Sequence, residues 1–273
     1  TGQDNDGNQR TAVCCLSSLN IDTYDQWSED PQFIEDVMRF LDNVMTDFID
    51  RAPDEFAHAK YSAMRERSVG LGVMGLHSYF QQKNIPFGSV MSKVWNKKIF
   101  KNIQEKVDLA SVSLAEERGA CPDAAEYGMK ERFSNKTAIA PTASISIICG
   151  GSSPGIEPIA ANSYTHKTLS GSFNVRNKYL KKILQKYKKD TDDVWSTITT
   201  NQGSVAHLNF LTPDEKDTFK TAFEIDQRWI VELGADRTPH ISQAQSINIF
   251  IPADIHKKDL HDLHFQAWKK GLK

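Results

Sequence analysis

The sequence predicts an α/β fold, because short apolar stretches typical of buried strands alternate with longer stretches whose apolar residues recur at helical spacing. Residues 11–20 (TAVCCLSSLN) and 246–252 (SINIFIP) have the clearest strand patterns, and residues 92–118 form the longest expected helix. Apolar strands between helices favour buried, largely parallel pairing. The 273 residues contain no internal repeat and no convincing linker, so we expect a single domain over residues 1–273.

In the first half of the chain, helix signals follow the first strand. Asp30 and Pro31 are typical of a helix N-terminus, and an apolar stripe at helical spacing then continues to Ile49. The long helix at residues 92–118 keeps a similar stripe and is expected to end at Gly119.

In the second half, three further helices are expected, over residues 178–193, 212–234 and 254–270. The first is rich in lysine, but its apolar residues keep helical spacing, which predicts a solvated helix face rather than a binding tail. Thr212 and Glu215 have the spacing of a capping box, with Pro213 at the first helical position. The strand at residues 246–252 comes between the last two of these helices.

The composition excludes several classes of function. The net charge is −2, so the chain lacks the basic surface of a nucleic-acid-binding protein. It has no apolar run near the roughly 20 residues that a membrane span needs, and residues 1–10 are too polar for a signal peptide. Four cysteines, at positions 14, 15, 121 and 149, have neither zinc-site spacing nor the spacing of a secreted disulfide framework. We therefore expect a cytoplasmic protein.

Two motifs suggest cofactors but have simpler interpretations. Gly70, Gly72 and Gly75 match the dinucleotide pattern G-x-G-x-x-G, yet the charged residues 65–68 precede them and residues 89–93 contain no acidic side chain. A close-packed turn is favoured over nicotinamide binding. Three histidines, His256, His261 and His264, could bind zinc. A wet outer face of the last helix is the favoured interpretation.

The most informative stretch is residues 137–158 (TAIAPTASISIICGGSSPGIEP). Small residues and hydroxyls follow Pro141, then an apolar run, then glycine and serine. A strand between two loops would explain this pattern structurally. The chemical alternative is an anion site, because small side chains let an anion approach the backbone amides and the hydroxyls add donors.

These residues carry a resemblance to a known family. The AIAPTASIS and GIEP segments resemble the substrate-phosphate segment of ribonucleotide reductase large subunits. Other blocks resemble the same family, fall in its order and cover essentially the whole chain: residues 65–75, 117–124, 162–176, 221–232 and 245–254. On this basis the glycine pattern is a packing segment of the family, and the nicotinamide hypothesis is dropped.

The resemblance implies a fold and an activity. Members of the family fold as a ten-stranded α/β barrel, of which this chain would be the C-terminal part and incomplete on its own. They reduce ribonucleotides to 2′-deoxyribonucleotides by thiyl-radical chemistry, with a redox cysteine pair as electron donor. The class I type is favoured, because residues 240–254 resemble it more closely than the adenosylcobalamin-dependent class.

The resemblance also implies site residues. Cys14 falls where the family has the second cysteine of the reducing pair, whose partner is not in this sequence. If residues 11–20 are a strand, Cys15 should point to the opposite face, since adjacent strand residues alternate. The substrate diphosphate would be held by Pro141, Thr142, Ala143, Ser144 and Ile145.

Several parts of the family pattern are missing from this sequence. The finger-loop motif Asn-x-Cys-x-Glu, the nucleotide-effector segments of the N-terminal portion and the tyrosine pair that should follow Lys273 are not present. A split or intein-interrupted gene would produce such a chain. We expect no cofactor bound by this chain, and no metal site.

The expected partners follow from the same resemblance. They are a ribonucleoside diphosphate substrate, the N-terminal portion of the subunit, a metal-containing small subunit that generates the radical, thioredoxin or glutaredoxin as dithiol reductant, and a second copy in a homodimer, with neither nucleic acid nor membrane. Two alternatives stay open: the adenosylcobalamin-dependent class, and a non-catalytic phosphate-binding module.

Overall fold

The centre of the molecule is a small parallel sheet. The loop of residues 141–145, where the diphosphate is expected, lies at the carboxyl ends of its strands. A computed structural model describes residues 2–13, 15–168 and 171–272. Strand β3 (Leu16–Asn20) pairs in parallel with β4 (Gly70–Met74) over five residue pairs. Parallel bridges then join Leu71 to Thr137 and Ile139 to Gln245. These bridges extend the parallel sheet beyond β4 by two further segments. Four chain segments therefore run in the same direction through the core.

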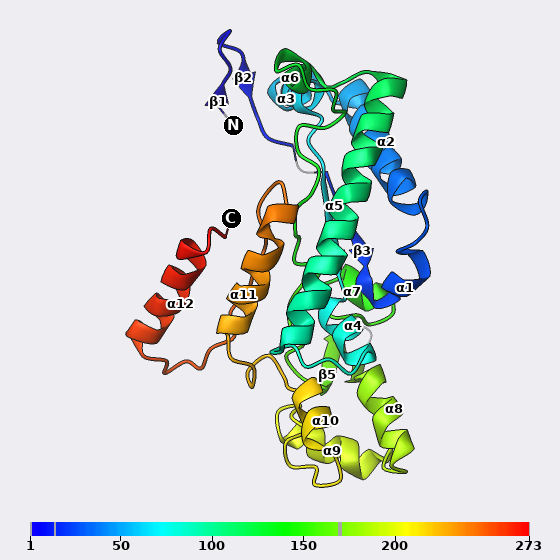
Figure 1. The fold of residues 1–273 in the computed structure, drawn as a ribbon, viewed down its shortest axis with the longest axis vertical. Coiled ribbons are helices and arrows are strands. Elements are labelled where there is room, and N and C mark those ends of the chain that lie inside the picture. The colour runs from blue at the N-terminus through cyan, green and yellow to red at the C-terminus, as the bar shows by residue number, and fades with distance from the viewer. Residues whose placement is uncertain (1, 14, 169–170, 273) are drawn as a thin grey trace.

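Helices connect and cover these parallel segments, as crossover connections require (Figure 1). Between β3 and β4 lie η1 (Ile21–Thr23), α1 (Tyr24–Trp27), α2 (Phe33–Arg51), η2 (Asp54–Phe56) and α3 (Ala57–Glu66). After β4 come α4 (Leu76–Gln82), the long central helix α5 (Val90–Arg118) and α6 (Pro122–Glu126). Helix α5 contacts both α2 and α11. The predicted alternation of strands and helices is confirmed.

The second half of the chain adds a hairpin and mostly short helices. Its elements are α7 (Ile145–Ile148), β5 (Ser163–Thr168), β6 (Gly171–Arg176), α8 (Lys178–Lys186), α9 (Asp192–Thr200), α10 (Pro213–Thr218), α11 (Arg228–Arg237), η3 (Thr238–His240) and α12 (Lys257–Lys269). Strands β5 and β6 are antiparallel, as are the short strands β1 (Gly2–Gln3) and β2 (Gln9–Arg10) near the N-terminus. Helix α12 packs outside α11 (Figure 1).

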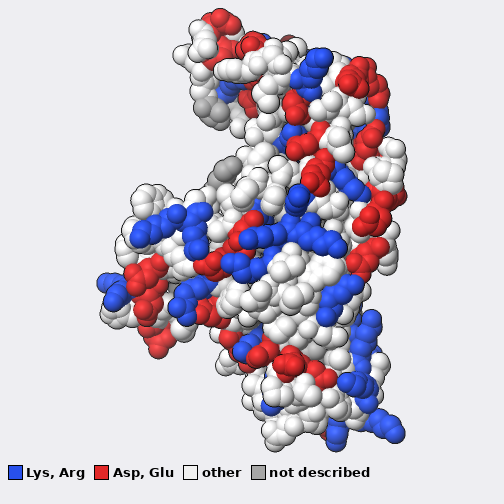
Figure 2. Space-filling view, in the orientation of Figure 1, with Lys and Arg blue, Asp and Glu red and all other residues white. Residues whose placement is uncertain are grey.

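Two hydrophobic clusters form the interior. The larger surrounds the parallel sheet and includes the inward faces of α2, α4 and α5. The smaller lies among α8, α9 and α10, around the fully buried Trp195. Lysines gather at the α8 corner of Figure 2, on the outer face of a helix whose Leu180 and Leu184 are buried, so the predicted solvated face is confirmed. One domain over residues 1–273 stays a prediction.

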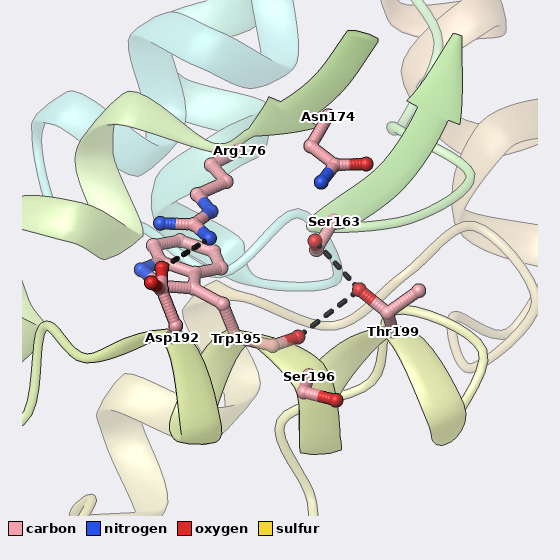
Figure 3. Close-up of a pocket in the computed structure, with 7 residues that line it drawn as sticks. All are labelled: Ser163, Asn174, Arg176, Asp192, Trp195, Ser196 and Thr199. Atoms are coloured by element: carbon pink, nitrogen blue, oxygen red, sulfur yellow. Dashed lines mark hydrogen bonds and ion pairs between the residues drawn. The ribbon is translucent and has the colours of Figure 1, made fainter. Parts of the chain in front are cut away.

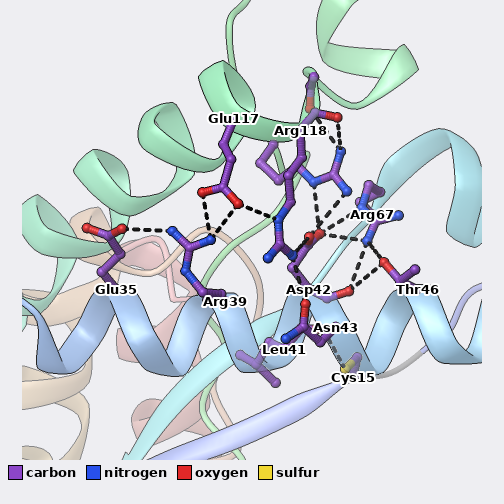
Figure 4. A network of polar contacts seen from close by, with 12 residues as sticks. Cys15, Glu35, Arg39, Leu41, Asp42, Asn43, Thr46, Arg67, Glu117 and Arg118 are labelled. Carbon is purple, nitrogen blue, oxygen red and sulfur yellow. Dashed lines mark hydrogen bonds and ion pairs between the residues drawn. The ribbon is translucent and has the colours of Figure 1, made fainter.

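A buried carboxylate joins α2 to the end of α5 (Figure 4). Asp42 has no exposed surface, and it accepts hydrogen bonds from Arg67 Nε at 2.9 Å, Arg118 Nη1 at 2.8 Å and Arg132 Nε at 2.9 Å. Burial alone would raise the pKa of Asp42, but hydrogen bonds from Arg132 and Arg118 outweigh it and hold the pKa below its ordinary value. The network therefore joins α2 and the end of α5 to Arg67, which lies between α3 and β4.

Gly70 and Gly72 of the G-x-G-x-x-G pattern lie in a fully buried strand, so the turn predicted there is wrong, while the close packing is confirmed. A Cβ atom at Gly72 would lie 2.3 Å from Ala138 O, and one at Gly70 would lie 2.4 Å from Leu16 Cδ2. Neighbouring strands therefore approach too closely for any side chain at Gly72. Gly75 follows with φ of +82° and begins α4.

Several predicted boundaries are corrected by the structure. The first strand begins at Leu16 rather than residue 11, and residues 246–252 form no strand although Gln245 makes a bridge. The capping box at Thr212 is confirmed, but its helix ends at Thr218 and a separate helix begins at Arg228. Backbone pairing with a partner strand, rather than apolar alternation alone, decides where a strand exists.

The helix expected over residues 178–193 ends at Lys186, and a separate helix begins at Asp192. The starts of three other helices shift by two or three residues. Helix α2 begins at Phe33, after a turn in which the Asp30 carboxylate accepts from Gln32 N at 2.9 Å. Helix α5 begins at Val90, because Ser89 caps it. His256 rather than Asp254 caps α12, through its Nδ1 atom. Amides that donate to the Ser89 and His256 side chains thus set the starts of α5 and α12.

Candidate functional site

The 141–145 loop lies where the parallel segments end. It follows Ile139, the bridge residue of the third segment, and thus shares an edge of the sheet with the residues after β3 and β4. In α/β folds, ligands bind outside the carboxyl ends of the strands. The location agrees with a binding site. The strand predicted for the apolar run after residues 141–144 is wrong, because Ile145–Ile148 form the short helix α7, and the strand bridges lie earlier, at Thr137 and Ile139.

Thr142 holds the loop in a strained conformation. Its φ is +52°, in the left-handed region that a β-branched residue rarely adopts. Its side chain is buried, and Thr142 Oγ1 accepts a hydrogen bond from Gly155 N at 2.7 Å. This bond joins the two ends of the segment from Thr142 to Gly155 and stabilises the strained conformation. Sequence reasoning expected this hydroxyl to face the anion, but it points into the protein instead.

The rest of the loop presents unused donors. The backbone N–H groups of Ala143, Ser144 and Ile145 and the Ser144 hydroxyl donate no hydrogen bond to any residue that the structure describes. All three residues are exposed. Consecutive free amides are suited to donate to phosphate oxygens, and the small side chains of Ala143 and Ser144 leave them accessible. Ser144 is therefore the hydroxyl that can reach an anion here.

The chain then returns to the core through residues 149–155, here called the return arm. Ser153 exchanges two hydrogen bonds with Ser78: Ser153 N donates to Ser78 Oγ at 2.8 Å, and Ser78 N donates to Ser153 Oγ at 3.1 Å. Gly75 N also donates to Ser153 O at 2.7 Å. The end of β4 and the start of α4 thus hold the return arm.

The GIEP segment has a structural role. Glu157 is buried, and its carboxylate accepts from Asn248 N at 2.8 Å and Asn248 Nδ2 at 3.0 Å. This contact joins residues after the fourth parallel segment to the GIEP segment, which follows the return arm. Residues 246–252 have no strand partner but are held by such side-chain contacts, since Phe250 N also donates to Gln227 Oε1 at 2.7 Å.

The cysteine predictions have different outcomes. Cys14, the expected redox residue, lies outside the described residues, so its role stays a prediction. Cys15 is half-buried, its thiol donates to Leu41 O at 3.9 Å, and its carbonyl accepts from Gly70 N at 2.9 Å. Because Cys15 precedes β3, strand alternation no longer supports the assignment of opposite faces. Cys121 is buried, which raises the pKa of its thiol, and Cys149 is exposed on the return arm.

Sequence reasoning missed three residues around the return arm. Asn20 ends β3, Asp22 follows it, and both contact the arm. His77, in α4 next to Ser78, has no exposed surface. His77 Nδ1 accepts from Ile159 N at 3.0 Å, and burial lowers its pKa to about 3, so the ring is neutral. Polar residues at the end of a strand are the signal that could have identified Asn20 and Asp22.

The three C-terminal histidines do not form a zinc site. His264 Nδ1 contacts Leu260 O at 2.8 Å, while the His261 ring stacks on Phe265. Within residues 2–13, 15–168 and 171–272, no three His, Cys, Asp or Glu side chains converge as a metal site requires. All three histidines are exposed, so the favoured outer face is confirmed. No helix among the described residues is long and apolar enough to cross a membrane.

A separate hollow of about 370 Å³ lies between the β5–β6 hairpin and α9 (Figure 3). It contains Arg176, which pairs with Asp192 at 2.8 Å and covers the Trp195 ring at 5.3 Å. Ser163 and Thr199 hydroxyls join at 2.8 Å across it. The polar groups that line it are thus largely engaged with one another, and none belongs to residues 137–158.

Comparisons with known proteins identify the family of the chain. The family model of the ribonucleotide reductase barrel domain matches residues 3–131 and 122–273. The chain is 50% identical over 268 residues to the ribonucleoside-diphosphate reductase large subunit of Invertebrate iridescent virus 6, covering 97% of this chain and 28% of that protein. It is 46% identical to that of Invertebrate iridescent virus 3, covering 97% and 42%.

A solved structure has the same fold. The class Id ribonucleotide reductase alpha subunit of Actinobacillus ureae superposes with a TM-score of 0.90 and 39% identity, over 97% of this chain and 49% of that one. The chain therefore spans less than half the length of these relatives. Its open parallel sheet is part of a barrel, as expected. Because the family model covers nearly the whole chain, the chain belongs to the ribonucleotide reductase barrel-domain family.

Proposed function

We propose that this chain is part of the catalytic subunit of a ribonucleoside-diphosphate reductase, where it binds the substrate diphosphate and supplies one reducing cysteine. The observation that carries the proposal is the 141–145 loop, with three free amides and a free hydroxyl at the carboxyl ends of the parallel segments. Membership of the family supports the reaction class, and the names of the relatives support the diphosphate form of the substrate.

The loop would bind the diphosphate through hydrogen bonds rather than through a buried cation. The N–H groups of Ala143, Ser144 and Ile145 are available to the phosphate oxygens, and the Ser144 hydroxyl adds a fourth donor. Hydrogen bonds to a charged acceptor are stronger than neutral ones, so four donors can orient the anion. Binding the diphosphate here would hold the ribose toward the interior of the completed barrel.

Cys14 would supply half of the reducing equivalents. Two thiols are oxidised to one disulfide, and their two electrons and two protons replace the 2′-hydroxyl of the ribose by hydrogen and release it as water. The second thiol belongs to the remainder of the subunit. A radical from a metal-containing small subunit would initiate the reaction when that subunit is bound. Thioredoxin or glutaredoxin would reduce the disulfide again, a process suited to the cytoplasm.

The remaining parts of the proposal concern assembly. Nucleotide effectors would bind the remainder of the subunit, and the completed subunit would form a homodimer. These statements rest on the family and on the relatives, which are about two to more than three times as long as the matched region.

The deciding experiment is reconstitution. The chain is combined with the remainder of the subunit, a small subunit and dithiothreitol, and deoxyribonucleotide formation is measured with and without adenosylcobalamin. Activity that needs the small subunit but not adenosylcobalamin supports the proposal. Activity that needs only adenosylcobalamin supports the second class of reductase. Binding of a ribonucleoside diphosphate without turnover in any combination leaves the non-catalytic module.

A further inference from the structure

A buried carboxylate beneath the return arm joins three distant parts of the chain. Asp22, in η1 just after β3, is 5% exposed. Its carboxylate accepts hydrogen bonds from the Tyr179 hydroxyl, from Lys178 Nζ and, at 3.1 Å, from Ser152 Oγ. Tyr179 and Lys178 begin α8, and Ser152 belongs to the return arm. We call these four residues the Asp22 clamp.

The clamp has further contacts with the return arm. Lys178 Nζ also donates to Gly150 O at 3.1 Å, and Ser152 Oγ also lies 3.1 Å from Asn20 Oδ1. Asn20 Nδ2 in turn donates to Cys149 O at 3.3 Å. Side chains of η1, β3 and α8 therefore hold residues 149–152.

The return arm is bonded directly to the segment that presents the donors. Ser152 N donates to Ser146 O at 3.1 Å, and Gly151 N donates to Ile147 O at 3.2 Å. Ser146 N donates to Thr142 O at 3.1 Å, which connects these bonds to the strained residue of the 141–145 loop. A continuous series of hydrogen bonds thus runs from Asp22 to the loop.

We propose that the Asp22 clamp is a positioning unit that fixes the 141–145 loop for a diphosphate. The inference rests on the proposed function, since the ligand is the same. An exposed loop with strained backbone would otherwise sample many conformations, and binding would have to order it. A buried carboxylate with three donors resists displacement, because loss of one partner leaves buried charge uncompensated. The clamp therefore supplies this order before the ligand arrives.

The chain contains a control with the same residue types but an exposed carboxylate: the Asp25 side chain is 51% exposed, against 3% for Asp22. Asp25, three residues after Asp22, accepts hydrogen bonds from the Tyr79 hydroxyl at 2.8 Å and from Lys83 Nζ. It is thus a second Asp–Tyr–Lys group on adjoining elements. Neither of these two hydrogen bonds involves residues 141–155. If the Asp22 clamp only attached α8 to the sheet, the two groups would behave alike toward the loop.

The experiment compares Asp22→Asn with Asp25→Asn in the full chain, alone and combined with the remainder of the subunit. Hydrogen–deuterium exchange is followed for residues 142–155, and the Kd for inorganic pyrophosphate is measured by calorimetry. We expect Asp22→Asn to speed exchange in this segment and to raise the Kd about tenfold, while Asp25→Asn changes neither. In the reconstituted enzyme the KM should rise with little change in kcat.

Tyr179→Phe and Tyr79→Phe provide a second pair that keeps the packing of both rings. Tyr179→Phe should reproduce the effects of Asp22→Asn in smaller measure, and this pair decides the question if Asp22→Asn fails to fold. Unchanged loop exchange in both Asp22→Asn and Tyr179→Phe, or equal effects in the Tyr79→Phe control, would overturn the proposal. If the unaltered chain binds no pyrophosphate in any combination, the proposed function fails, and the exchange data still decide whether the clamp orders the loop.

Discussion

At the scale of single residues, two neighbouring hydroxyls in one loop have different roles. Thr142 is buried and bonded to Gly155, so it maintains the loop, whereas Ser144 is exposed and free to contact a ligand. Replacing Ser144 with Glu places a negative charge where the diphosphate should bind. The KM of the reconstituted enzyme should rise by two orders of magnitude or more, measured by steady-state kinetics.

The control for this change is Ser144→Ala, which removes one hydrogen bond without adding charge. It should cost about 1 to 2 kcal/mol of binding free energy. An unaltered KM in Ser144→Glu would mean that the phosphates lie elsewhere.

The two adjacent cysteines should differ in their effect on turnover. Cys14→Ser should stop multiple turnovers supported by dithiothreitol, because no disulfide can form, while substrate binding persists. Cys15→Ser should turn over almost normally and lose some stability, since its thiol packs in a half-buried position against α2. Product is counted per active site over many cycles. The reverse result, an inactive Cys15→Ser with an active Cys14→Ser, would move the assignment by one residue.

His77 should make stability depend on pH. Its pKa is about 3 in the folded chain, whereas an exposed histidine ring has a pKa of 6.5, so on acidification the unfolded state binds the proton first. The neutral, buried His77 ring thus contributes a stability that is present above pH 6.5 and is lost as the pH falls toward 3. Between pH 7 and pH 5 the free energy of unfolding should fall by about 2 kcal/mol from this group alone.

His77→Asn tests this assignment, because an amide oxygen can still accept the Ile159 N–H group but does not titrate in this range. The variant should lack the His77 contribution in urea titrations at pH 7 and pH 5. Identical pH dependence in both proteins would show that another group is responsible.

At the scale of elements, the packing of β4 against residues 137–139 depends on a single missing Cβ. Gly72→Ala would bring the new atom 2.3 Å from a backbone oxygen that cannot move without the strand. We expect a loss of about 3 kcal/mol in the free energy of unfolding. Gly70→Ala meets chiefly the end of the Leu16 side chain, which is 45% exposed and can rotate away, so its loss should be about 1 kcal/mol.

Chemical denaturation of both variants measures this difference. Equal losses would mean that the sheet can shift as a unit, and that the close approach does not determine the register of the parallel pair.

At the scale of the whole molecule, the sheet has an open edge. Strand β3 pairs only with β4 among residues 2–13, 15–168 and 171–272, and Leu16 on it is 45% exposed. An unpaired edge next to apolar surface promotes association. The chain by itself should therefore be poorly soluble and inactive. Addition of the remainder of the subunit should restore solubility and activity. Light scattering and turnover are measured on the same samples, and turnover by the chain alone would contradict this prediction.

The sequence by itself determined the α/β class, the family and the location of the 141–145 loop. These depend on local signals: apolar periodicity sets the helices, capping residues such as Thr212 set their starts, and a run of small residues leaves backbone amides accessible. Such signals lie within a few residues of one another, so a linear pattern contains them. The glycine pattern also predicted close packing at Gly72. It did not show that the backbone of Ala138 is what packs there.

Only the tertiary structure decided which donors of the loop are free and which residues hold it. Thr142 turns inward because Gly155, thirteen residues later, donates to its hydroxyl, and Asn248 contacts Glu157 although no strand forms at residues 246–252. Asp22 meets Ser152 and Tyr179 across more than a hundred residues. The physical reason is that hydrogen-bond partners and burial are set by distance in space, which a sequence pattern of short range does not specify.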